Sequence, residues 1–539
     1  MRPSSAALLP VSTALACALL AALPSAAQDA AAPTEAPPAA ASAAGTPAPD
    51  GNTPFTAPVT IPGETIIPIT LEDAVQLALA SNLGLRVETF NRDTAREAVI
   101  IARAAYEPVF SVSASTYEAE TPNTTSTVDS TSSTRLSGSA SVSQKVDTGA
   151  TLTLQSNLGR SEQQGGAALT NLYFGSDLAL TVRQPLLAGA GFKVNRAARD
   201  RARIGVERSD ITYEGQALDI IRDTELAFYT LASAHYALDV QRSGLATAEQ
   251  FLNENEARRS AGIATELDVM QARVSVANRQ SLIISAEQRV RDATDQLLAL
   301  FGRRDFSGIL QPTGYVFAPP AALSVEASYG RAAETDATVR SNRGLLRQLE
   351  LDALVANNGK LPRLDLVGNA GINGSDRYTL ANTDPDLGGA VDDMLEGDAY
   401  NWQVQLNLTL PWGMREARAR KRIADYNVEQ QMVRLEQLEQ SLMVNVRAAV
   451  RAVEADRQTV EINALSTELS KREFELEKAK FDSGLSTSRL VVEAQQRWDE
   501  AKVREIQSRV QLRQDMARLR RLEGGSLQLY GVTSLDRAQ

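Results

Sequence analysis

Two kinds of hydrophobic pattern alternate along this chain, and each kind occurs in both halves. Long stretches place apolar residues three and four positions apart among charged ones, which predicts amphipathic helices with coiled-coil-like seams. The seams include Ile211, Leu218, Leu231 and Leu238 in the first half, and a similar series runs from Val428 to Ala449 in the second. Shorter stretches alternate apolar and polar residues, which predicts strands with two unlike faces. The chain therefore combines long helices with a sheet.

The order of these patterns predicts one unit that is repeated. The first repeat covers 69–302, with a helix at 71–105, strands within 108–184, a long helix at 192–258 and a helix at 265–301. The second covers 323–523, with a helix at 323–358, strands within 362–410, a long helix at 414–480 and a helix at 487–523. A linker at 303–322 joins the repeats, and a tail at 524–539 follows them. At about 1.5 Å per residue, each long helix extends for about 100 Å, beside two shorter helices placed end to end.

The strand regions carry the clearest alternation in "WQVQLNLTLPW", where Trp402 and the apolar residues that follow it share one face. A soluble sheet half-covered by helices has the same pattern, but these helices are too long to cover a small sheet. Trp402 and Trp412 would lie about 33 Å apart along a strand, or about 25 Å apart in height if the strand tilts by about 40°. That height matches the lipid-facing band of an outer-membrane barrel, which aromatic residues border on both sides. The sequence therefore predicts a membrane β-barrel with an aromatic girdle made of Trp402, Trp412, Tyr400, Tyr117 and Tyr173.

The first 27 residues have the layout of a secretory signal peptide, with one Arg, an apolar run and small residues before Gln28. A retained membrane anchor and a lipoprotein signal centred on Cys17 are the alternatives. Residues 28–68 are rich in Ala and Pro and have few large apolar side chains, which predicts a flexible leader. Removal of the signal peptide would leave a chain without cysteine and so without disulfides. The pattern therefore indicates an exported protein.

Composition argues against two broad classes of function. The net charge of −11 disfavours a general nucleic-acid-binding protein, which needs a basic surface. The single histidine, His235, lies in the middle of a predicted helix, and the sequence has no nucleophile, nucleotide or Cys/His metal motif. We therefore expect no catalytic residues, no metal site and no cofactor.

The two repeats share a tip between their last two helices, in "EARRSAGIATELDVMQAR" and "EKAKFDSGLSTSRLVVEAQ". Together with "ITLEDAVQLALASN", "VRQPLLAGAGF" and a Pro after each short helix, these tips resemble the TolC-like outer-membrane efflux proteins, the outer membrane factor family, from Ile69 to Glu523. The resemblance implies a homotrimer in which the protomers share an outer-membrane β-barrel and a periplasmic α-barrel. It also implies a passive exit duct of a tripartite efflux or type I secretion system in a Gram-negative bacterium. Its partners would be a periplasmic adaptor (membrane fusion) protein, an inner-membrane transporter and outer-membrane lipid.

The tips would then be the adaptor-docking end, with Gly262 and Gly484 as helix caps, Thr265 and Thr487 as N-caps, and Ile263 and Leu485 beside them. The resemblance also implies gating residues at a narrow entrance, for which Asp268, Phe481, Arg489 and Glu493 are the candidates. Phe481 stands where the family has a tyrosine, Ser486 where it has an arginine, and Leu490 where it has an acid. Asp268 and Glu493 could equally be acids favoured by the helix dipole.

Two alternatives remain open from the sequence. The first half has four candidate strands, where the family's unit has two, and the extra hairpin near 136–159 could either join the barrel or lie outside it. The other function class that fits the pattern is an exported soluble coiled-coil scaffold without a pore.

Overall fold

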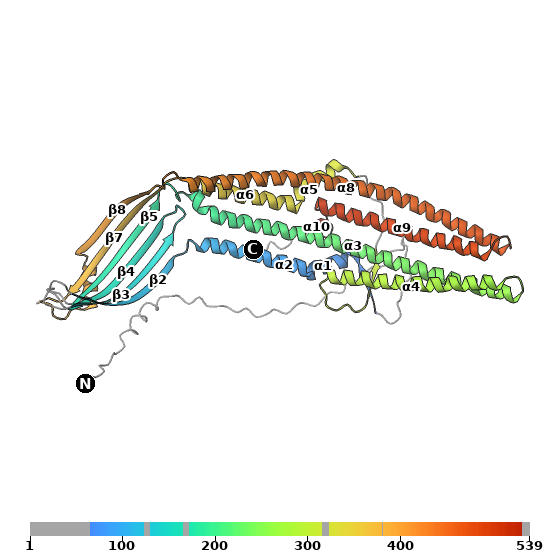
Figure 1. Ribbon diagram of the computed structural model, residues 1–539, viewed down its shortest axis with the longest axis horizontal. Coiled ribbons are helices and arrows are strands. Elements are labelled where there is room, and N and C mark those ends of the chain that lie inside the picture. Colours follow the sequence, from blue (N-terminus) through green and yellow to red (C-terminus); the bar gives the residue numbers. More distant parts are fainter. Residues whose placement is uncertain (1–64, 123–129, 165–171, 315–322, 380, 531–539) are drawn as a thin grey trace, which may run out of the picture. The chain divides into compact units, whose positions relative to one another are not determined.

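A computed structural model describes residues 65–122, 130–164, 172–314, 323–379 and 381–530, which all belong to the compact unit Thr53–Gln539. The predicted signal peptide, residues 28–64 of the leader and the end of the tail lie outside the described residues. A six-stranded sheet occupies one end of this unit, and the helices run away from it to two tips at the other end (Figure 1).

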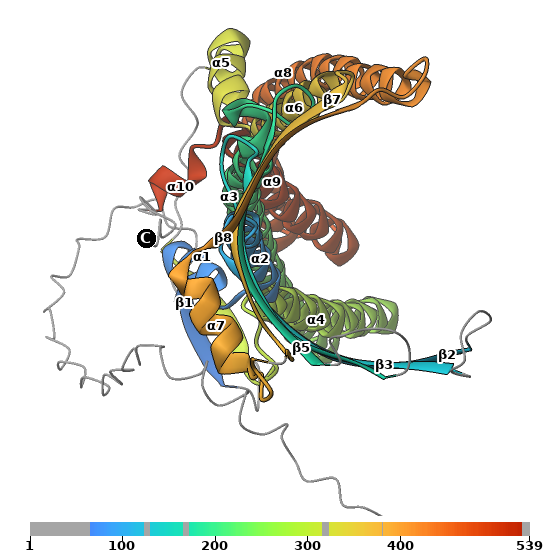
Figure 2. The same ribbon diagram turned by 90° about the vertical axis from the view of Figure 1, so that its left-hand side faces the viewer.

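The sheet is antiparallel throughout, in the order β2-β3-β4-β5-β7-β8. The extra hairpin is part of it, because β3 pairs with β2 on one side and β4 pairs with β5 on the other. The sheet curves, and its free edges are β2 and β8 (Figure 2). Its strands are β2 (Val109–Pro122), β3 (Ser130–Lys145), β4 (Thr151–Gln164), β5 (Leu172–Pro185), β7 (Arg363–Arg377) and β8 (Ala399–Thr409).

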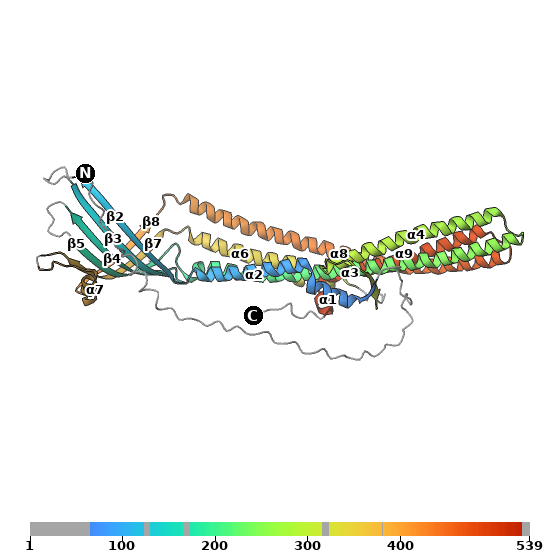
Figure 3. The ribbon, with the colours of Figure 1, turned by 90° about the horizontal axis from the view of Figure 1, so that it is seen from below.

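Two long helices form the frame of the helical part, and shorter helices lie along them (Figure 3). The long ones are α3 (Phe192–Ser260, 69 residues) and α8 (Arg415–Asp482, 68 residues). Near the sheet, α2 (Leu83–Ala104) packs on α3, and α6 (Ala337–Asn358) packs between α3 and α8. Toward the tips, α4 (Glu266–Leu300) packs on α3, and α9 (Ser488–Glu523) packs on both α8 and α3.

The first helix of each repeat differs from its prediction, because each is divided in two. The expected helix at 71–105 consists of α1 (Leu71–Ser81) and α2, and that at 323–358 consists of α5 (Val325–Thr335) and α6. Asn82 and Asp336 stand at the breaks, where each side chain accepts a hydrogen bond from the backbone N–H three residues further on. These residues therefore cap a new helix and end the old one.

Two short strands lie in segments that were predicted as leader and linker. β1 (Ile66–Thr70) pairs in parallel with β6 (Ile309–Thr313) beside the middle of α3. Residues 66–68 therefore belong to the fold and not to a flexible leader. The largest apolar core gathers here from α1, α3, α4 and β6, around fully buried side chains such as Phe228, Leu231 and Leu297. A short helix, α10 (Ser526–Leu529), begins the predicted tail.

The connection between β7 and β8 is not a simple loop. It contains α7 (Leu387–Glu396), which packs on β7 and β5 at the end of the sheet that lies far from the long helices (Figure 3). Asp386 caps this helix by accepting a hydrogen bond from the N–H of Gly389 at 2.7 Å.

Candidate functional site

The strand register gives the sheet one apolar face that is continuous across all its strands. One row of directly paired residues consists of Phe110, Val142, Leu154, Leu180, Ala370 and Trp402. The pairing continues without a bulge, so every second residue of each strand lies on this face. The face is apolar toward the helices and carries charged residues such as Glu118 and Arg160 toward the outer ends of the strands. Many of these side chains are exposed, as in Phe110 at 74% and Trp402 at 71%. An exposed apolar face of this extent indicates contact with lipid or with another protein.

The opposite face is polar and has its own hydrogen-bonded side chains. The hydroxyls of Ser113 and Ser139 lie 2.7 Å apart across β2 and β3, and the amide of Asn157 donates to Asp177 at 2.8 Å across β4 and β5. Because α7 packs on the apolar face and lies against the convex side of the sheet in Figure 2, the polar face is the concave one. A sheet of this kind suits a wall between an apolar and an aqueous medium.

The five residues predicted for the aromatic girdle do not share one face of the sheet. Trp402 and Tyr400 lie on the apolar face. Tyr117 and Tyr173 are on the polar face, because they alternate with Thr116 and Phe174 in the register. Trp412 lies beyond the end of β8 and is fully exposed.

Both tips turn in the same way. Gly262 and Gly484 adopt φ values of 76° and 75°, a left-handed conformation that suits glycine. In the first tip the N–H of Ile263 donates to the carbonyl of Arg258 at 2.9 Å, and the N–H of Gly262 donates to that of Arg259 at 2.9 Å. The second tip has the same two bonds, which define a Schellman motif. A Cβ on either glycine would meet nothing within 4 Å, so backbone conformation and not space selects glycine.

The residues after the two glycines are apolar and exposed. Ile263 is 77% exposed and Leu485 is 81% exposed. In most Schellman motifs such a residue packs back on its own helix. Here both side chains are left open at the tips, which suits a surface that another protein covers.

The helices that return from the tips begin differently. Thr265 and Asp268 form a capping box: the Thr265 hydroxyl accepts from the N–H of Asp268 at 3.3 Å, and the Asp268 carboxylate accepts from the N–H of Thr265 at 2.9 Å. The Thr265 hydroxyl also donates to the Asp268 carboxylate at 2.7 Å, and this bond, together with the one from the Thr265 N–H, holds the pKa of Asp268 below its usual value. Thr487 occupies the N-cap of α9, but its side chain makes no capping bond. The third residue of α9 is Leu490, which cannot return a hydrogen bond as Asp268 does.

The four gating candidates occupy three different environments. Asp268 belongs to the capping box, and Arg489 and Glu493 form an ion pair one turn apart on α9. Phe481 is 4% exposed and packs against Phe251 of α3, with ring centroids 5.5 Å apart. The guanidinium carbon of Arg258 lies 4.1 Å from the Phe481 ring centroid, in cation–π geometry. Phe481 of the second repeat therefore joins the two repeats, through its contacts with Phe251 and Arg258 of the first.

Polar contacts between the repeats extend along α3, α4 and α9, and the sequence did not indicate them. Asn255 of α3 donates to the Ser488 hydroxyl of α9 at 3.1 Å, and both residues are buried. Arg279 of α4 and Asp499 of α9 form an ion pair of 2.8 Å in which both side chains are at most 9% exposed. Each residue lies in a charge-rich helical run, where charges are usually solvated, so the sequence has no signal that marks these as buried.

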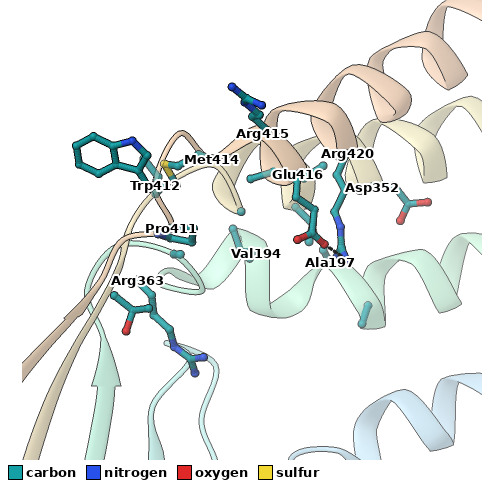
Figure 4. Close-up of a pocket in the computed structure, with 18 of the residues that line it drawn as sticks. Val194, Ala197, Asp352, Arg363, Pro411, Trp412, Met414, Arg415, Glu416 and Arg420 are labelled. Carbon is teal, nitrogen blue, oxygen red and sulfur yellow. Dashed lines mark hydrogen bonds and ion pairs between the residues drawn. The ribbon is translucent and has the colours of Figure 1, made fainter.

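A cavity of about 950 Å³ lies where the sheet passes into the helices, between the ends of α3, α6 and α8. Arg363 and Thr409 of the polar sheet face line it, and Glu416 and Arg420 of α8 turn toward Ala197 of α3, with Trp412 pointing away (Figure 4). The polar face of the sheet therefore borders this cavity at the junction with the helices.

Within the described ranges, no helix is both long enough and apolar enough to cross a membrane. The same residues contain no cluster of three or more His, Cys, Asp or Glu side chains that could hold a metal ion.

Residues 151–303 and 329–525 match the family model described as outer membrane efflux protein. A search among curated proteins gives no match. The fold is similar to solved structures of outer-membrane channels. The channel OprN is 18% identical with a TM-score of 0.62, and the alignment covers 84% of this chain and 90% of that one. CmeC of Campylobacter jejuni is 18% identical with a TM-score of 0.60 over 84% and 85% of the two chains. The open state of MtrE of Neisseria gonorrhoeae is 18% identical with a TM-score of 0.59 over 85% and 89%.

Proposed function

The chain belongs to the outer membrane efflux protein family, and we propose that three copies of it form a passive exit duct for a tripartite efflux or type I secretion system. Family membership and the fold of outer-membrane channels support a place in the outer membrane of a Gram-negative bacterium. In this proposal the apolar sheet face contacts lipid, the polar face lines the duct, and the helices extend into the periplasm.

The observation that carries the proposal is the pair of free edges of the folded chain. At one edge of the sheet, β2 pairs only with β3 among the described residues, and α2 and α4 expose apolar side chains at helical spacing. These side chains are Leu83, Val87 and Phe90 on α2, and Leu267, Met270 and Val274 on α4. At the other edge, β8 pairs only with β7 in the same part of the chain, and α8 exposes Ile423, Tyr426, Val433, Ile462, Leu465, Leu469 and Leu476.

Each edge therefore offers an unpaired strand in line with an apolar helical stripe. Unpaired strand edges and apolar stripes of this length are unfavourable in water, and closure into a ring covers both. If β8 of one copy pairs with β2 of the next, three copies close a barrel of eighteen strands, six from each copy. The helical stripes would meet at the same interfaces.

The tips are the proposed docking end for a periplasmic adaptor, which an inner-membrane transporter would supply with substrate. Exposed Ile263 and Leu485 support this role, because each projects from a rigid turn with no cover in its own chain. Asp268, Phe481, Arg489 and Glu493 are the proposed entrance residues. Among them we assign Phe481 the largest part in holding the entrance, because its ring packs between the two repeats.

The test is single-channel conductance of the detergent-extracted protein in a planar bilayer, together with native mass spectrometry. We expect a steady conductance and a trimer. Phe90→Arg should reduce the trimer population, because the substitution places a charge in the α2 stripe. Phe306→Arg is the matched control, since Phe306 is also an exposed phenylalanine but lies in the inter-repeat segment, outside both apolar stripes. A protein that needs no detergent and never inserts would instead be a soluble scaffold.

A further inference from the structure

The helix α7 occupies part of the apolar face of the sheet. The hydroxyl of Ser176 on β5 donates to the carbonyl of Ala390 at 2.6 Å. Gly374 on β7 pairs with Ser176 in the register, and a Cβ on Gly374 would lie 2.2 Å from the same carbonyl. Ala390 and Met394 are buried in this contact. Glycine and serine are thus the small residues that let α7 lie directly on the strands.

The contacts of α7 fix its rotation about its own axis. Its polar flank lies toward the outer end of β7: Asp393 accepts from the N–H of Ser375 at 2.7 Å, and a Cβ on Gly389 would lie 2.5 Å from Asp376. The residues two positions before and two positions after Asp393 are each separated from it by about 160° around the helix axis. Val391 and Leu395 must therefore face the other way along the sheet, toward Ile372 and the apolar rows.

The described residues cover this second flank of α7 only in part. Leu395 is 69% exposed, and Leu387 and Val391 are half-buried. The flank continues the apolar face, because Ile372 lies next to Gly374 on that face of β7, and Leu366 and Leu364 lie on it further toward the helices. Exposed Asp392 and Glu396 follow on the side of the helix that points away from the sheet.

We propose that α7 is an interfacial helix whose Val391–Leu395 flank enters the acyl-chain region of the outer leaflet, with Asp392 and Glu396 at the level of the headgroups. The inference rests on the proposed function, because it takes the apolar sheet face to be the lipid-facing one. Amphipathic helices of this kind insert about 5–10 Å into the boundary between headgroups and acyl chains. Here the sheet fixes the depth of the helix, so α7 would hold the outer rim of the barrel at a set height in the leaflet.

The experiment uses single-tryptophan variants in phosphatidylcholine vesicles whose acyl chains are brominated near the glycerol end. Bromine quenches tryptophan fluorescence only at close range. One variant keeps Trp402, and the others have Leu395→Trp or Glu396→Trp, with all other tryptophans replaced by phenylalanine. Glu396 is the matched control, because it is exposed and about 100° round the same helix from Leu395. We expect Leu395→Trp to be quenched at least about half as strongly as Trp402, and Glu396→Trp less than about one fifth as strongly.

A second pair of variants tests whether the sheet sets the depth of α7. Gly374→Ala should displace the helix and lower the quenching of Leu395→Trp by at least about twofold. Gly368→Ala should leave it unchanged, because a Cβ there meets nothing within 4 Å. If Trp402 itself is not quenched, the proposed function fails. If Trp402 is quenched but Leu395→Trp is no more quenched than Glu396→Trp, the barrel stands and the assignment of α7 to the membrane interface is wrong.

Discussion

The buried ion pair between Arg279 and Asp499 gives the sharpest test of how the two repeats are held together. Asp499 is 3% exposed and Arg279 is 9% exposed, and their closest atoms lie 2.8 Å apart. Arg279 also donates to Gln241 at 3.1 Å, and Lys502 contacts the other Asp499 oxygen at 2.8 Å. A Cβ on Gly244 of α3 would lie 3.0 Å from Asp499, so glycine leaves room for the pair.

Asp499→Asn keeps the shape of the side chain and removes its charge. The Arg279 guanidinium then stays buried with neutral amide groups as its partners in place of the carboxylate. Loss of one charge of a buried ion pair lowers the free energy of unfolding by about 3–5 kcal/mol. The matched control is Glu473→Gln, which removes one partner of the Arg497–Glu473 pair between α8 and α9. That pair has a similar distance of 2.7 Å, but its side chains are 50% and 51% exposed. Its loss should cost less than about 1 kcal/mol.

Urea unfolding of the detergent-solubilised protein, followed by circular dichroism at fixed protein concentration, measures both changes. The double variant Arg279→Met/Asp499→Leu should recover most of the loss, because it leaves no charge buried. If Asp499→Asn and Glu473→Gln cost the same within about 1 kcal/mol, burial does not set the strength of this contact and the reasoning is refuted.

Three further predictions concern the helical part. Burial, together with the neighbouring Asp515 carboxylate, raises the pKa of Asp456 from 3.8 to about 6. The protonated Asp456 carboxyl therefore contributes fully to folding stability below pH 3.8, and this contribution is lost as the pH rises through about 6. Asp456→Asn removes the titrating group, so it should flatten the pH dependence of the thermal midpoint over this range. Thr265→Ala should lower the local stability of the first turn of α4 by about 1 kcal/mol and speed hydrogen exchange of its backbone amides. Thr487→Ala should change exchange in α9 little, because the Thr487 side chain makes no capping bond. Phe481→Ala should remove the ring that packs on Phe251 and raise single-channel conductance, while Leu485→Ala should not; equal conductance in both variants would contradict the role of Phe481.

The repeated unit was predictable because its signals are periodic over long stretches. The strands around Phe110 and Trp402 alternate strictly, and the long helices keep apolar residues such as Leu231 and Leu238 one heptad apart. The tips were predictable because glycine at the end of a helix and threonine at the start of the next have a direct backbone cause. Both kinds of signal depend on residues that are close together in the sequence, so they can be recognised without knowing the tertiary contacts.

What the sequence did not indicate depends on contacts between distant segments or on weak local cues. No feature of the sequence around Arg279 identifies Asp499 as its partner, since both residues lie in charge-rich stretches of the kind found on solvent-exposed helix faces. The breaks at Asn82 and Asp336 had a local cue, an N-cap side chain inside a helical pattern. Gly388 and Gly389 in α7 resemble a loop, although the residues from Leu387 to Leu395 place their apolar side chains on one side of a helix.

The difference between α3 and α8 bears on the whole assembly. The two helices have nearly equal length and equivalent places in the repeats. α3 buries side chains along most of its length, because it has helices on both sides. Among the described residues, α8 packs on α5, α6 and α9 and buries fewer side chains, which are Gln431, Leu442, Val446, Val450, Val453 and Phe481. A duplicated sequence therefore has two unequal environments within one chain. Ring closure would remove this inequality, because α2 and α4 of a second copy would give α8 the neighbours that α3 already has. In the closed ring, the apolar residues that α8 exposes in the single chain would be buried at the interface between copies.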